Sequence, residues 1–142
     1  METRIIEFGS NDYSDMISLR LNVLLHPIGI NESYINKEKE KHDVLIGLFN
    51  DNRLIGCCIL STINKETIQL RQMAVLPEFQ KSGSGRKILA FAEFIAKEKG
   101  YKILMMHARD AVLDFYKKCG YTISGAQFFE VGVPHHKMEK QL

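Results

Sequence analysis

The residues best suited to chemistry lie in the segment 73–88, where an apolar run ends at Pro77 and the pattern Gln80-x-x-Gly83-x-Gly85 leads into a helical pattern. Glycine lets the backbone approach a ligand closely, and the free N–H groups at the start of a helix attract anions. Three basic side chains lie in or beside this loop: Lys81, Arg86 and Lys87. The segment therefore indicates a binding loop for a phosphate or a pyrophosphate.

Two common phosphate loops are excluded by the residues that follow. A Walker loop requires Gly-Lys and then Ser or Thr, whereas Lys87 follows Arg86 and precedes Ile88. A dinucleotide fingerprint requires a third glycine where Ile88 stands. From these residues alone, a turn that joins a strand to a helix without binding any ligand stays open as the alternative.

Two longer matches concern this loop and a second segment. Residues 80–85 fit the acyl-CoA loop Gln/Arg-x-x-Gly-x-Gly/Ala of the GNAT superfamily of N-acetyltransferases, and residues 73–75 (Met-Ala-Val) stand where that family has the end of a strand. Residues 115–121 (Phe-Tyr-Lys-Lys-Cys-Gly-Tyr) fit the second mark of the family, Phe-Tyr-x-x-x-Gly-Phe/Tyr. The chain therefore resembles the GNAT superfamily over residues 67–124.

The tail extends the resemblance. Residues 130–138 (Glu-Val-Gly-Val-Pro-His-His-Lys-Met) are similar to the ending Glu-x-Gly-Ile/Val-Pro-His-x-x-Met of a small bacterial subgroup of that family. The subgroup also has the stretch at residues 69–75, an Arg-x-x-Val as at Arg20 and Val23, and a His-Ala-Arg as at residues 107–109. The resemblance then covers nearly the whole chain, but it says little about the acceptor.

The resemblance implies acetyl-CoA as co-substrate and no metal. Backbone groups of residues 73–75 would bind its pantetheine arm, and amides of residues 81–86 would bind its pyrophosphate; the side chains of Met73 and Val75 suit the core equally well. Many relatives have an asparagine at the position of Arg109. Arg109 in its place could bind a phosphate or an acidic substrate, or could be a solvated residue at the start of a helix. The cofactor-binding residues implied are Met73, Ala74, Val75, Gln80, Lys81, Ser82, Gly83, Ser84, Gly85, Arg86 and Arg109.

The implied chemistry is the attack of an amine on a thioester, which needs a base, an oxyanion donor and an acid for the leaving thiolate. The family pattern assigns the acid to Tyr116, and a phenol with a pKa of about 10 is matched to an alkyl thiolate. The alternative for Tyr116 is an aromatic side chain packed in the core. The backbone N–H of Val75 is the expected oxyanion donor.

The base is less clearly marked. Some relatives have a glutamate where Gln69 stands, and Glu66 nearby suits a solvated turn. His107 ends a buried strand pattern, and histidine ordinarily titrates near neutral pH, so His107 is the expected base. Two alternatives stay open: His107 is only a hydrogen-bonded, partly buried structural residue, or water takes the proton. His135 and His136 could reach the site from a strand start, but neighbours on a strand face opposite ways and make no chelating pair.

The patterns around these residues predict an α/β protein that positions them. Strands are expected at 3–8, 44–49, 54–63, 67–76, 101–107, 121–124 and 136–139, and helices at 13–25, 31–41, 84–99 and 110–118. The resemblance implies the GNAT fold: a mixed, mostly antiparallel sheet of six to seven strands flanked by about four helices. It also implies a V-shaped splay between the strands at about 67–76 and 102–107.

Local patterns give further expectations for the helices. Glu93 and Lys97 are spaced for an ion pair on one helix, and Asp110 is placed to cap the next. The charged segment 31–41 is expected as a surface helix, decorated by Glu38, Glu40 and their neighbouring lysines.

Composition bounds the partners and the compartment. The 142 residues, with a formal charge of +2, fit one domain at residues 1–142 and argue against a nucleic-acid partner. No apolar run suits a membrane span, and the first residues do not have the pattern of a signal peptide. The three cysteines, at positions 57, 58 and 119, form no Cys-x-x-Cys pair, which favours free thiols in a reducing cytoplasm.

The resulting prediction is an acetyl-CoA-dependent enzyme that moves an acetyl group directly to a primary amine of a small molecule. Two alternatives stay open. One is a glucosamine-phosphate N-acetyltransferase, with Arg71 or Arg109 holding the phosphate. The other is a non-catalytic acyl-CoA-binding module, which Gln69 in the base position favours. Many relatives dimerise, so a homodimer and a monomer are both open.

Overall fold

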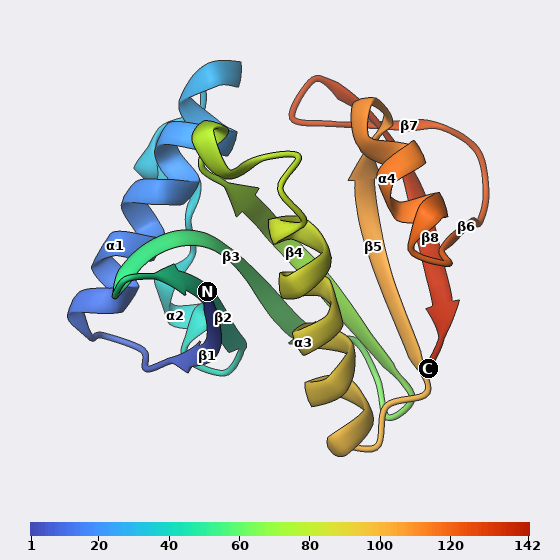
Figure 1. Ribbon diagram of the computed structural model, residues 1–142. Helices are drawn as coiled ribbons and strands as arrows, with labels where there is room; N and C mark the ends of the chain where they lie inside the picture. Colours follow the sequence, from blue (N-terminus) through green and yellow to red (C-terminus); the bar gives the residue numbers. More distant parts are fainter.

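The computed structural model describes residues 1–142 and contains one eight-stranded sheet, in the order β1-β2-β3-β4-β5-β8-β6, with β7 paired to β8 (Figure 1). Every strand pair is antiparallel except β4–β5. The strands are β1 (Glu2–Ile6), β2 (Val44–Asn50), β3 (Arg53–Thr62), β4 (Thr67–Val75), β5 (Ile103–Arg109), β6 (Thr122–Ile123), β7 (Phe128–Glu130) and β8 (Val133–Gln141). The α-helices are α1 (Asn11–Arg20), α2 (Lys37–Glu40), α3 (Ser84–Glu98) and α4 (Leu113–Lys118). The predicted GNAT architecture is confirmed, with β7 as a strand that the sequence patterns missed.

Two apolar clusters cover the two faces of the sheet. One contains buried side chains of α3 and α4, and the other contains those of α1. Cys57 and Cys58 are neighbours on β3, yet they belong to different clusters, as the alternation of side chains along a strand requires. Both thiols are free and fully buried.

The parallel strands β4 and β5 separate partway along their length. They pair from Thr67 with Ile103 to Leu70 with Met106, and no further. Beyond that point β4 continues to Val75 and β5 continues away from it, as Figure 1 shows. The predicted splay is therefore present, and it opens after the fourth pair.

A bulge bends β4 at the start of this splay. Ile59 pairs with Arg71 and Cys57 pairs with Ala74, so two residues of β4 stand opposite one of β3. Gln72 in the bulge has a left-handed backbone, with φ of 56°. A side chain rarely adopts this conformation without support from its surroundings.

The segment 31–41 is not the single surface helix expected from its charge. It contains a 3₁₀ turn, Glu32–Tyr34, and the one-turn helix α2. Asn31 and Asn36 each accept a hydrogen bond from a backbone N–H two or three residues later and so begin separate turns, with Ile35 extended between them. The expectation that Glu40 decorates the surface is also wrong, because this side chain is buried.

The helices beside the splay differ from expectation in two local contacts. The carboxylate of Glu93 on α3 bonds the Tyr121 hydroxyl and the Lys140 ammonium rather than Lys97. Asp110 begins a 3₁₀ turn, Asp110–Val112, and its carboxylate bonds two side chains instead of capping α4. In both cases a partner distant in sequence replaces the local one.

None of the helices has the length and apolar character needed to cross a bilayer.

Candidate functional site

The loop between β4 and α3 presents a run of free backbone donors. No N–H group from Lys81 to Arg86 donates a hydrogen bond within the chain, and the first helical bond is from the Lys87 N–H to the Gly83 carbonyl, at 3.1 Å. Lys81 and Gly83 have left-handed backbones, with φ of 64° and 82°. Free N–H groups in such a turn at a helix start form an anion site.

Side chains of the loop hold its shape. The amide of Gln80 donates to the Val75 carbonyl at 2.9 Å and ties the loop to the end of β4. The Ser82 hydroxyl donates to the Phe79 carbonyl at 2.5 Å and lies 3.0 Å from the hydroxyl of the buried Ser84. The side chains of Gln80, Ser82 and Ser84 are thus engaged within the protein, whereas the backbone amides of residues 81–86 are free.

The end of β4 directs a backbone donor into the splay. Leu76 donates its N–H to the Ile55 carbonyl at 2.9 Å, and Val75 is paired one step earlier with Gly56. Because donors alternate between the two edges of a strand, the N–H of Val75 points away from β3. This N–H therefore faces the region where β5 has separated from β4.

Tyr116 on α4 is 5% exposed and belongs to the cluster beneath α3 and α4. Burial raises the pKa of its phenol well above the usual range, with a smaller contribution from Cys58, so the phenol is protonated at neutral pH. The hydroxyl has no hydrogen-bond partner in the structure. Among the side-chain oxygens and nitrogens, Asp43 Oδ2 is the only one that is fully buried and has no hydrogen-bond partner. The unpartnered Tyr116 hydroxyl is therefore not fully buried, and it reaches solvent. It is a free, protonated donor.

The loop and α4 are in direct contact. A Cβ atom added to Gly85 would lie 3.0 Å from the ring of Phe115, closer than side chains ordinarily pack. The Phe115 ring in turn packs edge-on against Tyr116, with centroids 5.0 Å apart. Gly85 therefore allows the start of α3 to approach the helix that carries Tyr116.

Arg71 and His107 stand on either side of the splay, on the sheet face that α1 covers. Leu70 and Met106, the last paired residues, both enter the cluster of α3 and α4, so the residues after them project from the opposite face. His107 Nδ1 lies 3.1 Å from Glu130 Oε1. In the tautomer with its proton on Nδ1, His107 keeps Nε2 free to accept a proton.

The other residues considered as a base or an anion ligand are placed as follows. Arg109 on β5 donates to the Leu24 carbonyl at 3.1 Å, in the π-helical turn Leu21–Leu25 that follows α1. Gln69 lies on β4 within the paired part of the strand. Glu66 is in the exposed turn before β4, 3.9 Å from the Lys102 ammonium. The structure thus keeps Glu66 away from the splay.

His135 and His136 face opposite sides of β8, as predicted. Nδ1 of His135 lies 2.7 Å from the Val133 carbonyl, and Nδ1 of His136 lies 2.7 Å from Asp110 Oδ1. The hydrogen bond from His136 is the main reason that the pKa of Asp110 is lowered, and Gln127 adds to it. No group of three or more His, Cys, Asp or Glu side chains is arranged to hold a metal ion.

A buried polar network supports the bulge of β4. Arg20 donates from Nη1 and Nη2 to the two oxygens of Glu40, at 3.0 and 2.7 Å, and from Nε to Gln72 Oε1 at 3.3 Å. The Tyr13 hydroxyl donates to Glu40 Oε1 at 2.7 Å. Burial favours a raised pKa for Glu40, but the hydrogen bonds and charge of Arg20 outweigh it and lower the pKa. Of this network the subgroup pattern included Arg20 and, within residues 69–75, Gln72. It gave no sign that Glu40 joins them, since Glu40 was expected on the surface.

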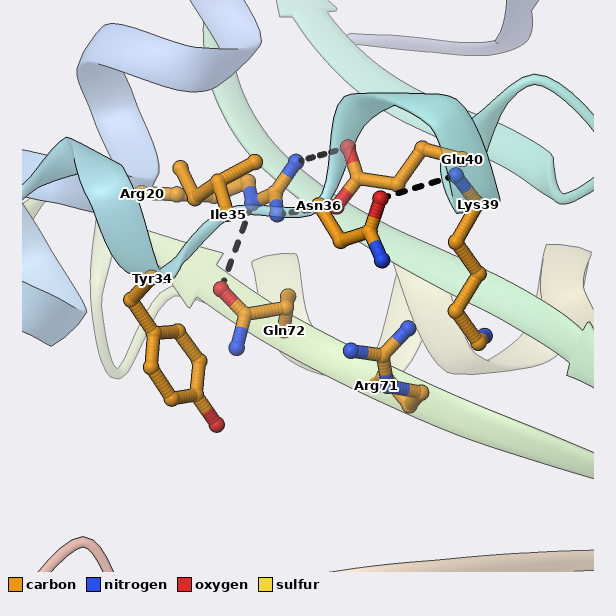
Figure 2. Close-up of a pocket in the computed structure, with 8 residues that line it drawn as sticks. All are labelled: Arg20, Tyr34, Ile35, Asn36, Lys39, Glu40, Arg71 and Gln72. Carbon is orange, nitrogen blue, oxygen red and sulfur yellow. Dashed lines mark hydrogen bonds and ion pairs between the residues drawn. The ribbon is translucent and has the colours of Figure 1, made fainter.

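A small pocket with a volume of about 160 Å³ lies beside this network. Figure 2 shows the residues that line it. Arg20 and Glu40 form its floor, and the side chains of Tyr34, Lys39 and Arg71 extend toward the open space. It lies between the segment 31–41 and the bulge of β4.

Comparisons with known proteins agree with this geometry. Residues 22–142 match the family model described as an acetyltransferase (GNAT) domain. YyaT of Bacillus subtilis strain 168, whose own function is uncharacterised, is 28% identical over 137 residues, covering 92% of this chain and 90% of YyaT. A Lactobacillus plantarum protein provisionally named an N-acetyltransferase superposes with a TM-score of 0.88 at 21% identity, covering 100% of this chain and 99% of that one. A GNAT family acetyltransferase of Elizabethkingia anophelis, with acetyl-CoA bound, superposes with a TM-score of 0.79 at 22% identity, covering 99% and 97%.

Proposed function

The chain belongs to the GNAT acetyltransferase family, and on that premise we propose that it moves an acetyl group from acetyl-CoA directly to the primary amine of a small molecule. The observation that carries the proposal is the run of free N–H groups from Lys81 to Arg86 beside the splayed end of β4. The acetyl-CoA bound to the Elizabethkingia relative supports the same donor here. We propose also that residues 1–142 form one domain, supported by the single sheet.

The proposed binding of acetyl-CoA uses backbone groups. The amides of residues 81–86 receive the pyrophosphate, and exposed Lys81 and Arg86 add positive charge at the loop. The N–H groups of Met73 and Val75 receive the pantetheine arm and the thioester. The hydrogen bond from Gln80 to the Val75 carbonyl joins the loop to the end of β4, and so connects the two halves of the site.

The proposed chemistry follows from the groups around the splay. The amine nitrogen attacks the thioester carbon while the N–H of Val75 donates to the oxyanion. The carbon–sulfur bond then breaks, and Tyr116 donates its proton to the leaving thiolate. His107, oriented by Glu130, accepts the proton that the amine nitrogen loses. No covalent enzyme intermediate is needed, which fits the two buried cysteines.

A transfer assay tests the proposal. Purified protein is incubated with isotope-labelled acetyl-CoA and a set of primary amines, which includes amino acids, polyamines and amino-sugar phosphates. We expect one N-acetyl product and one free CoA thiol per turnover, both detected by mass spectrometry. Binding of acetyl-CoA without acetyl transfer to any amine, thiol or protein lysine would refute the transferase and favour a non-catalytic binding module.

A further inference from the structure

The pocket of Figure 2 has an excess of positive charge. Its floor is neutral, because Arg20 and Glu40 pair with each other and are both buried. The remaining cations are Lys39 and Arg71, which lie 3.7 and 3.8 Å from the same carboxylate oxygen, Asp43 Oδ2. One carboxylate thus faces two cations.

The cations are only loosely held by that carboxylate. Asp43 Oδ2 is buried and accepts no hydrogen bond, and the other contact of both cations is with the Ser61 hydroxyl, at 3.4 Å. Most of the N–H donors of Arg71 and Lys39 are therefore uncommitted. A buried carboxylate holds both side chains near the pocket, while their donors remain available to a ligand.

The pocket adjoins the part of β4 that leads to the proposed reaction site. Arg71 is the first residue of β4 beyond the last β4–β5 pair, and Gln72, which lines the pocket, immediately precedes Met73. His107, the proposed base, projects from the same sheet face. A ligand held by Arg71 can place an amine beside the thioester that the end of β4 would hold.

We propose that the acetyl acceptor is an amine that carries an anionic group, either a carboxylate or a phosphate, and that Arg71 and Lys39 bind that group. The inference rests on the proposed acetyl transfer and adds the chemical class of the acceptor. The guanidinium of Arg71 matches both oxyanions with paired hydrogen bonds, and Lys39 adds a second charge. A pocket of about 160 Å³ is large enough for such a head group and a few waters.

The test compares matched pairs of amines that differ only in the anion. An amino acid is compared with its carboxamide, and an amino-sugar phosphate with the free amino sugar. Binding to the CoA-saturated protein is measured by calorimetry, and transfer by steady-state kinetics. We expect the anionic member of at least one pair to bind and react, and Arg71→Gln to raise its Kd and KM about 10- to 100-fold. The kcat and the KM for acetyl-CoA should change little.

Lys41→Gln is the matched control. Lys41 lies on the same segment, pairs with Glu38 and does not line the pocket, so its removal should leave both constants unchanged. Arg71→Lys separates charge from geometry, because it should restore phosphate binding more than carboxylate binding.

Equal binding of anionic and neutral partners, no binding of any anionic member, or an Arg71→Gln variant as effective as wild type, would overturn the inference. If acetyl transfer to neutral amines were still observed, the proposed acetyltransferase function would stand and only the anion site would be wrong. Binding of anions through Arg71 without acetyl transfer would support the anion site and refute the proposed reaction. The two failures are therefore distinguishable.

Discussion

Arg20 and Glu40 form a paired contact in the interior, with nitrogen–oxygen distances of 3.0 and 2.7 Å and side chains that are 1% and 2% exposed. The pair joins the end of α1 to α2, and the Nε of Arg20 donates a hydrogen bond to Gln72 in the bulge of β4. It therefore connects the segment 31–41 to the strand that would hold the thioester. The pocket that Arg71 lines is also lined by this pair (Figure 2).

Removing one member of the pair should cost much of the stability. Arg20→Met leaves Glu40 buried without its cation, and we expect a loss of about 3–5 kcal/mol in the free energy of unfolding, measured by urea denaturation. The double variant Arg20→Met with Glu40→Met should recover most of it. Lys37→Met is the control, because its exposed pair with Glu32 should contribute less than about 1 kcal/mol. Equal effects of Arg20→Met and Lys37→Met would contradict the account.

The same pair makes stability depend on acid pH. The pKa of Glu40 is lower in the folded protein than its ordinary value of 4.5, so its contribution is complete above about pH 4.5 and is lost as the pH falls through the folded pKa. Urea denaturation between pH 7 and pH 3 should show a shallower acid loss for Glu40→Gln than for wild type. Glu66→Gln, in an exposed turn, should retain the wild-type slope. Parallel profiles for wild type and Glu40→Gln would exclude this role.

The cysteines should differ sharply in reactivity. Burial raises the pKa of the Cys57 thiol to about 12 and raises that of Cys58 well above its usual range, whereas Cys119 is partly exposed. Ellman's reagent at pH 8 should therefore modify one thiol per native chain and three after unfolding in urea. Cys119→Ser should abolish the native reaction. Rapid labelling of two or more native thiols would show that the β3 cysteines are accessible.

Tyr116→Phe should separate chemistry from binding. Loss of the phenol proton donor is expected to lower kcat about 100-fold, while the Kd for acetyl-CoA stays within about threefold of wild type. Tyr121→Phe is the control: it removes a neighbouring buried hydroxyl that bonds Glu93 and should leave kcat nearly unchanged. A wild-type kcat for Tyr116→Phe would mean that this side chain only packs in the core.

Local patterns account for the parts of the fold that the sequence could predict. The hairpins from β2 to β4, the helix α3 with Gly100 after its end at φ of 88°, and the strand–loop–helix order around Gln80 all depend on residues close together in the chain. The free amides of the loop follow from the same local pattern, since the start of a helix leaves its first N–H groups unpaired.

Long-range partners decide what could not be predicted. Glu40 lies in a charged segment that is typical of a solvent-exposed surface, and only its pairing with Arg20 on another helix makes its burial favourable. Asp110 is well placed for a cap, but His136, far along the chain, takes its carboxylate. The left-handed backbone of Gln72 has no local signature, because the bulge depends on pairing with β3.

A bisubstrate analogue tests the central claim most directly, because it needs the loop, the splay and the Arg71 pocket at once. CoA is joined through an acetyl bridge to the nitrogen of the anionic amine that reacts best, and its Kd is measured by calorimetry against that of CoA. We expect binding about 100-fold tighter than CoA, as two linked ligands produce when both sites are engaged, and loss of most of this gain in Arg71→Gln. An analogue that binds wild type no more tightly than CoA would contradict the account.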